Sequence, residues 1–140
     1  MNREIEFRGQ CVLNGEWLYG DLEYSRNDKD VVRIHTYNDD GSYKQQCLVV
    51  PDTVGQFTGL VDKNGVKIFE GDILELVVTY QGKPVGEPRI RKVVWKGSGL
   101  YIVNKHNDCV CERSATCQEE EYRVIGNIHN NPELLSTKQA

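Results

Sequence analysis

The chain has 140 residues, of which 39% are hydrophobic and 27% are charged, and its formal net charge is −4. This length suits one domain or two small units, and the charge is too balanced for a disordered chain. The acidic balance also lacks the positive charge that is typical of nucleic-acid-binding domains.

The start of the chain and its cysteine content indicate a cellular compartment. Residues 1–10 are charged rather than apolar, and apolar runs such as 47–50 are far too short to cross a bilayer. The five cysteines form an odd number without a secretory signal, which favours reduced thiols. We therefore expect a cytoplasmic protein with no membrane association.

Alternating apolar and polar residues predict β-strands through the first half of the chain. An Asn-Gly pair at 14–15 separates two apolar-rich runs and predicts a tight hairpin, because both residues accept positive φ. The turn cluster at 38–41 separates a β-branched strand at 31–37 from a strand that ends before Pro51. These elements predict an N-terminal β-meander that covers residues 1–58.

The second half of the chain is a series of strands and turns. Asn and Gly in the turns at 62–65 and 70–72 accept backbone conformations that other residues resist. The largely apolar run 73–80 predicts a strand that is buried on both faces or curled into a barrel. A polar connection is expected at 114–121. Further strands are expected at 66–69, 90–95, 100–103 and 122–128.

The end of the chain carries a helix-start signal. Asn131 can cap a helix, Pro132 suits the first helical position, and Glu133 complements the helix dipole. We therefore expect a mainly β fold, in which the β-meander packs on a C-terminal SH3-like barrel (59–140) with a short C-terminal helix. The predicted core contains Phe7, Leu22, Ile34, Val49, Phe57, Leu60, Ile68, Ile73, Leu76, Val94, Trp95, Ile102, Val124, Ile125 and Ile128.

Six motifs span nearly the whole chain. They are a charged strand at 5–8, Phe-Thr-Gly-Leu at 57–60, Asp-Lys-Asn-Gly at 62–65, Glu-Gly-Asp-Ile at 70–73, Ile-Gly-Asn-Ile at 125–128 and Asn-Pro-Glu-Leu-Leu at 131–135. In this order they resemble the YopX family of phage and prophage proteins. The resemblance implies an accessory protein in a bacterial host, and it brings with it no catalytic or ligand-binding residues. The segment 106–121 lies outside the motifs.

A group of metal-ligating residue types lies in that segment. Three thiolates and an imidazole can complete a tetrahedral zinc site. The Cys-x-Cys spacing differs from the usual Cys-x-x-Cys spacing, however, and small apolar residues in the core are the favoured interpretation. We therefore expect no cofactor. The candidate metal ligands are His106, Cys109, Cys111 and Cys117.

Two carboxylates flank Gly71. Paired carboxylates can perform general acid–base catalysis, but an Asp at a strand entry usually binds nearby backbone N–H groups. We favour a turn-fixing role for Asp72 over a catalytic role with Glu70, and we predict no catalytic residues. An enzyme would need a pocket that gathers Asp72, His129 and another titratable group.

A basic hairpin is the candidate nucleic-acid site. Phosphate attraction and base stacking on nearby aromatic residues could hold a single strand. The positive side chains alternate along a strand, so they do not all share one face. The cluster contains Lys83, Arg89, Arg91, Lys92 and Lys96.

Three functions therefore remain open. The first is a non-enzymatic accessory protein that binds an unknown protein partner, and the second is a nucleic-acid-binding module that uses the basic hairpin. The third, an uncharacterised enzyme, is the least favoured. Edge strands in the two sheet units also leave a homo-oligomer open.

Overall fold

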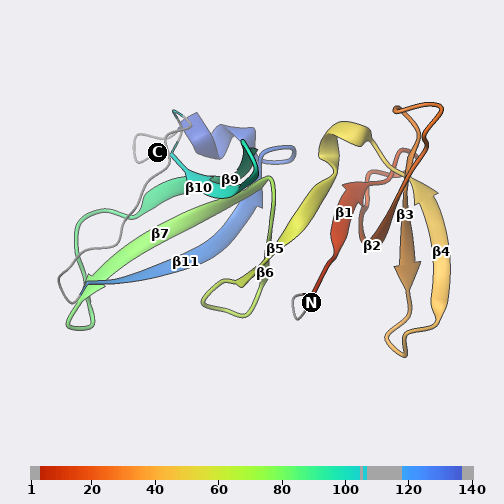
Figure 1. The fold of residues 1–140 in the computed structure, drawn as a ribbon. Coiled ribbons are helices and arrows are strands. Elements are labelled where there is room, and N and C mark those ends of the chain that lie inside the picture. Colours follow the sequence, from red (N-terminus) through yellow and green to blue (C-terminus); the bar gives the residue numbers. More distant parts are fainter. Residues whose placement is uncertain (1–3, 105, 107–117, 137–140) are drawn as a thin grey trace. The chain divides into compact units, whose positions relative to one another are not determined.

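The computed structural model describes residues 4–104, 106 and 118–136, and the chain divides into two compact units, Met1–Gly59 and Leu60–Ala140. The fold is mainly β, as the sequence predicts, with antiparallel sheets and two short 3₁₀ helices among the described residues (Figure 1). No helix in this part of the chain has the length and apolar character that a membrane span requires.

Unit 1 is an antiparallel sheet with the strand order β4-β3-β2-β1-β5. The predicted Asn-Gly turn at 14–15 joins β1 to β2, which pair directly. The 3₁₀ helix η1 (Pro51–Thr53) follows β4 and begins at Pro51, the residue before which the strand was predicted to end. The strands are β1 (Phe7–Gln10), β2 (Trp17–Tyr24), β3 (Val32–Tyr37), β4 (Tyr43–Leu48) and β5 (Gly55–Val61), whose last residues belong to unit 2.

The core of unit 1 lies on one face of its sheet. Val32, Ile34 and Val49 are at most 1% exposed and form its centre. Partly buried residues pack against this centre: Phe7, Leu18, Leu22 and Val54. Successive side chains of a strand point to opposite sides of the sheet, so the outward-pointing residues of β2 and β3 form a separate outer surface.

The segments that follow β1 and β4 meet at a seam in unit 1. Cys11 forms an isolated antiparallel bridge with Val49. On either side of it, the Val12 N–H donates to the Leu48 carbonyl (3.0 Å) and the Val50 N–H donates to the Gln10 carbonyl (2.9 Å). The C-terminal end of β4 is therefore covered by the segment that follows β1, which encloses the inner face.

Unit 2 is built on a second antiparallel sheet with the order β10-β9-β7-β11. The start of its long central strand β7 is buried on both faces, with Ile73 and Leu74 fully buried, whereas from Glu75 to Thr79 buried and partly buried residues alternate. β8 pairs with β7 beside this path. The strands are β6 (Lys67–Phe69), β7 (Asp72–Tyr80), β8 (Lys83–Pro84), β9 (Arg89–Lys96), β10 (Gly99–Val103) and β11 (Gln118–Asn127).

Two predicted core residues are wrong. Leu60 is 58% exposed and Trp95 is 53% exposed. Trp95 lies near the end of β9, where its indole N–H donates to the Gly97 carbonyl of the following turn (3.1 Å). The ring is therefore held over the turn instead of entering the core. The core of unit 2 centres on Ile68, which was predicted, and on Leu74 and Val93, which were not.

Two predicted element boundaries also change. β11 begins at Gln118, so part of the expected polar connection at 114–121 is strand, because residues 118–121 pair with Val77 to Tyr80 of β7. The expected terminal helix is a 3₁₀ helix, η2 (Pro132–Ser136), and the Leu134 N–H donates to the Asn131 carbonyl three residues earlier (3.1 Å). For β11, pairing with β7 outweighs the local preference of residues 118–121 for a polar connection.

Candidate interaction face

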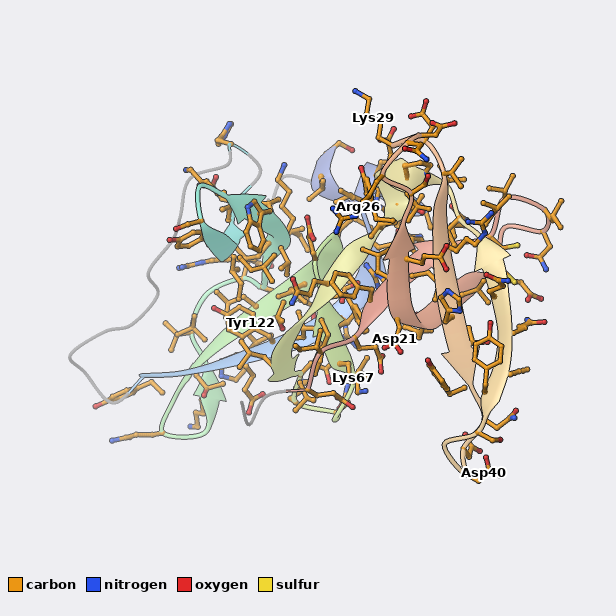
Figure 2. The ribbon with its side chains drawn as sticks, turned by 45° about the vertical axis from the view of Figure 1, so that its right-hand side comes forward. Asp21, Arg26, Lys29, Asp40, Lys67 and Tyr122 are labelled. Atoms are coloured by element: carbon orange, nitrogen blue, oxygen red, sulfur yellow. The ribbon has the colours of Figure 1, made fainter. Side chains whose placement is uncertain are left out.

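The outer face of unit 1 brings polar and aromatic side chains from three neighbouring strands together. We define this outer face by the outward residues of β2, β3 and β4. Register places Asp21 opposite His35 and Glu23 opposite Arg33, and the position of Asp21 can be followed in Figure 2. The members are Tyr19, Asp21, Glu23, Arg33, His35, Tyr37, Tyr43 and Leu48.

A hydrogen-bonded chain crosses the outer face from β2 to β4. The His35 Nε2 atom lies 2.7 Å from Glu23 Oε1, and its Nδ1 atom lies 3.0 Å from the Tyr43 hydroxyl. The Arg33 Nη1 atom donates to the other oxygen of Glu23 (3.2 Å). Both nitrogens of the imidazole are therefore engaged.

A second contact fixes the tyrosines beside this chain. The Tyr37 hydroxyl donates to Asp21 Oδ2 (2.7 Å), and the Tyr37 and Tyr43 rings meet edge to face with centroids 5.8 Å apart. The His35 and Tyr43 rings are also 5.8 Å apart. Edge-to-face pairs at this separation are favourable because ring edges and faces carry opposite partial charge. The exposed rings of β3 and β4 are thus held in one arrangement.

These contacts shift the pKa values of two groups on the outer face. The hydrogen bond from His35, assisted by the charge of Arg33, lowers the pKa of the Glu23 carboxyl below its ordinary value. The hydrogen bond to Asp21 raises the pKa of the Tyr37 phenol, because a phenol that donates to a carboxylate resists losing its proton. At neutral pH Glu23 is therefore an anion and Tyr37 is a neutral donor.

Gly20 permits the close strand spacing beneath the outer face. A Cβ atom at this position would lie 1.9 Å from the His35 carbonyl oxygen, which no side chain tolerates. Gly20 is also the point at which β2 changes partner, since Phe7 pairs with Gly20 and the next residue, Asp21, pairs with His35. The glycine therefore brings β2 against β3 where Asp21 and His35 lie side by side.

The chain Glu23–His35–Tyr43 has the order carboxylate, imidazole, hydroxyl that catalytic triads use. It lies on an open sheet face, however, with the Glu23 side chain 46% exposed and the His35 side chain 22% exposed. Electrostatic catalysis depends on a site that excludes water. An open, hydrogen-bonded lattice of aromatic and charged groups is better suited to binding another surface.

The structure separates the members of the predicted nucleic-acid cluster. Lys83, Arg89 and Lys96 are exposed and Lys92 is half-buried, whereas Arg91 is only 6% exposed. The Arg91 Nη1 atom donates to the Ile90 carbonyl (2.9 Å), and the residue pairs with Leu74 in the centre of the sheet. Arg91 is therefore largely shielded from solvent, and the nucleic-acid site on this cluster stays a prediction.

Most of the predicted zinc site lies outside the described residues. The predicted ligands Cys109, Cys111 and Cys117 are not among the described residues, so the zinc hypothesis stays a prediction. The His106 N–H donates to Asn104 Oδ1 (2.9 Å) in a local turn. Within residues 4–104, 106 and 118–136, no group of three or more His, Cys, Asp or Glu side chains is arranged to hold a metal ion.

The carboxylate of Asp72 holds the turn before β7. Asp72 is 2% exposed, and its Oδ2 accepts a hydrogen bond from the Phe69 N–H (2.7 Å). The intervening Gly71 is bound on both sides, because its N–H donates to Val93 (2.8 Å) and its carbonyl accepts from Ile128 (2.9 Å). This geometry fits the predicted turn-fixing role of Asp72.

The outer face is not predicted by the sequence alone, although the alternation shows which residues of one strand share a face. Period-two alternation places Asp21 with Glu23 and His35 with Tyr37 on common faces of their strands. The alternation does not say which strands are neighbours. The pairing of β2 with β3, and of β3 with β4 through a register shift at Thr36/Tyr37, is what assembles the outer face.

Comparisons with known proteins identify a family and a similar solved structure. The family model described as YopX protein matches residues 6–136. Among solved structures, protein EF1440 from Enterococcus faecalis is similar, with 26% identity over 96% of this chain and 99% of that chain and a TM-score of 0.54. No curated protein matches the chain. Since the family model covers nearly the whole sequence, the chain belongs to the YopX protein family.

Proposed function

We propose that this YopX-family chain is a non-enzymatic accessory protein of a bacteriophage or prophage, and that it acts in the cytoplasm of the bacterial host by binding another protein. The observation that carries the proposal is the outer face of unit 1. Its hydrogen bonds fix aromatic and charged side chains while leaving them accessible, for example Tyr43, which is 53% exposed.

Preorganisation supports binding as the role of this surface. Long polar side chains that are ordered only on association cost free energy, about 0.5–1.5 kcal/mol for each immobilised side chain. His35 is already hydrogen-bonded to Glu23 and Tyr43, and Tyr37 is hydrogen-bonded to Asp21, at 2.7–3.0 Å. A partner would therefore meet a surface that loses little further freedom. Tyrosine and arginine are also enriched at interface centres.

The alternative functions receive less support. The burial of Arg91 removes one of the five cations proposed for a nucleic-acid site. The burial of Asp72 and its hydrogen bond to the Phe69 N–H leave this carboxylate poorly placed to act on a substrate. We also propose that the antiparallel sheet of unit 2 belongs to an SH3-like barrel.

The proposal is tested by affinity capture from phage-infected host lysate, with the full chain as bait and with or without nuclease. We expect a protein partner to be retained after nuclease treatment. Recovery that disappears with nuclease would contradict the proposal and favour the basic hairpin. Sedimentation of the purified chain in parallel distinguishes a true partner from a second copy of the chain.

A further inference from the structure

The outer face of unit 1 is an open aromatic surface on an acidic unit. Its exposed tyrosine rings lie on β2, β3 and β4, and the Leu48 side chain at its margin adds aliphatic area. Such a surface on a protein usually serves contact with another molecule. The exposed fractions are 46% for Tyr19, 44% for Tyr37, 53% for Tyr43 and 46% for Leu48.

The negative charge of the chain is concentrated in unit 1. Residues 1–59 contain ten Asp and Glu against six Lys and Arg, so unit 1 carries the whole formal charge of −4. Residues 60–140 contain eleven of each kind and are neutral. A field of one sign accelerates the approach of oppositely charged partners. The charge of unit 1 therefore favours a cationic occupant for the outer face.

The geometry of the outer face favours arginine among the cationic side chains. A guanidinium group is planar, binds carboxylates with two parallel N–H donors and stacks on aromatic rings. Unit 1 itself contains one arginine–carboxylate contact, through a single nitrogen, and one arginine–ring contact. Arg33 Nη1 lies 3.2 Å from Glu23 Oε2, and the Arg8 guanidinium carbon lies 4.9 Å from the centre of the Trp17 ring. Each carboxylate oxygen can accept more than one hydrogen bond, so Asp21 and Glu23 keep capacity for a partner.

We infer that the outer face of unit 1 binds an extended, arginine-bearing segment of the protein partner. Outward side chains along β2 repeat every second residue, about 6.6–6.8 Å apart, which matches the spacing of alternate side chains in an extended chain. In such a complex, guanidinium groups lie over the Tyr37 and Tyr43 rings and donate to Asp21 and Glu23. This inference rests on the proposed function and names the chemistry of the partner.

The test is an NMR titration of the full ¹⁵N-labelled chain with a short peptide that alternates arginine and serine. We expect the largest amide shifts in residues 19–24, 32–37 and 43–48. Peptides in which lysine or glutamate replaces arginine are the matched probes, and we expect the lysine peptide to bind about fivefold more weakly because an ammonium group cannot stack or donate in parallel. Shifts of equal size with both cationic peptides, spread over acidic loops, would overturn the inference.

Two charge-matched double variants give the sharper comparison. We expect D21N/E23Q to weaken binding of the arginine peptide by about tenfold or more, since both carboxylates are lost while the side-chain shapes remain. D30N/D52N removes the same charge from exposed positions outside the outer face and is expected to weaken binding by less than about twofold. Equal weakening in the two variants would overturn the inference. So would a dimer of the free chain in which the outer face is already protected.

The lysate capture separates failure of this inference from failure of the proposed function. If D21N/E23Q and wild type retain the same protein after nuclease treatment, the proposed function stands and the inference about the outer face is overturned. If wild type retains no protein, the proposed function itself fails, whatever the peptide does. If wild type retains a protein partner that D21N/E23Q does not retain, and the NMR shifts map to the outer face, both the proposed function and the inference are supported.

Discussion

Asp62 accepts a hydrogen bond from the backbone N–H of Val124, 62 residues later in the chain, at 2.9 Å. The other oxygen of this carboxylate accepts from Asn64 N–H (2.8 Å) and Val66 N–H (2.9 Å). The next residue, Lys63, donates its N–H to the Tyr122 carbonyl (3.0 Å). The Asp-Lys-Asn-Gly motif is therefore both a turn and the clamp that fastens this turn to β11.

We predict that replacing Asp62 with Ala lowers the free energy of unfolding by about 2–4 kcal/mol, because three backbone donors lose their acceptor at a site that is 7% exposed. Urea unfolding of the two proteins measures the difference. Asp52→Ala, which removes an exposed carboxylate, is the control and should cost less than about 0.5 kcal/mol. Equal decreases in the free energy of unfolding of the two variants would contradict the role of Asp62 as a link between this turn and β11.

The clamp should also depend on pH. Burial alone would raise the pKa of Asp62, but the hydrogen bonds from Val124, Val66 and Asn64 outweigh it and lower the pKa below its ordinary value of 3.8. A carboxyl with a lowered folded-state pKa stabilises the fold above its unfolded-state pKa and loses that contribution as pH falls through the folded value.

The stability difference between wild type and Asp62→Asn should therefore be constant from neutral pH down to about pH 5 and shrink progressively below that. Chemical unfolding at a series of pH values provides the measurement. A difference that stays the same from neutral to strongly acidic pH would show that the charge of Asp62 contributes nothing.

A second contact joins the last two motifs of the chain. A Cβ atom at Gly126 would lie 2.5 Å from Asn131 Oδ1 and 2.8 Å from its Cγ. The same Oδ1 accepts a hydrogen bond from the Asn127 N–H (3.3 Å). The predicted helix-capping asparagine thus binds back to β11, and Gly126 provides the space for it.

We predict that Gly126→Ala destabilises the fold by about 1–3 kcal/mol through this overlap. Asn131→Gly in the same chain should recover part of the loss, because the clashing atoms are then absent. A double-mutant cycle of thermal unfolding measures the coupling. Additive effects of the two substitutions would mean that the two side chains are independent.

The thiols at the seam of unit 1 give a chemical prediction. Burial raises the pKa of the Cys47 thiol, and the neighbouring Cys11 adds to the shift. Because the thiolate is the reactive form, Cys47 should be alkylated more slowly than a free cysteine at neutral pH. Peptide mapping by mass spectrometry after timed iodoacetamide treatment gives the rate for this residue. An alkylation rate for native Cys47 equal to that in urea would contradict the prediction.

The sequence predicts turns well because their residues act locally. The positive φ angles of Gly15, Gly41, Gly65 and Gly97 lie where Asn-Gly and Gly-rich clusters indicate turns. Burial was predicted well where alternation is regular, as for Ile34, and poorly near strand ends, as for Trp95. The clamp of Asp62 and the assembly of the outer face depend on partners far away in the chain, and alternation within one strand contains no information about them.

We propose that this chain acts by binding a protein partner through the outer face of unit 1. The most direct measurement is amide hydrogen exchange of the full chain, alone and in complex with the partner captured from host lysate. We predict new protection in residues 19–24, 32–37 and 43–48, with little change elsewhere. Protection confined to the basic hairpin at 83–96, with unchanged exchange in β2, β3 and β4, would contradict it.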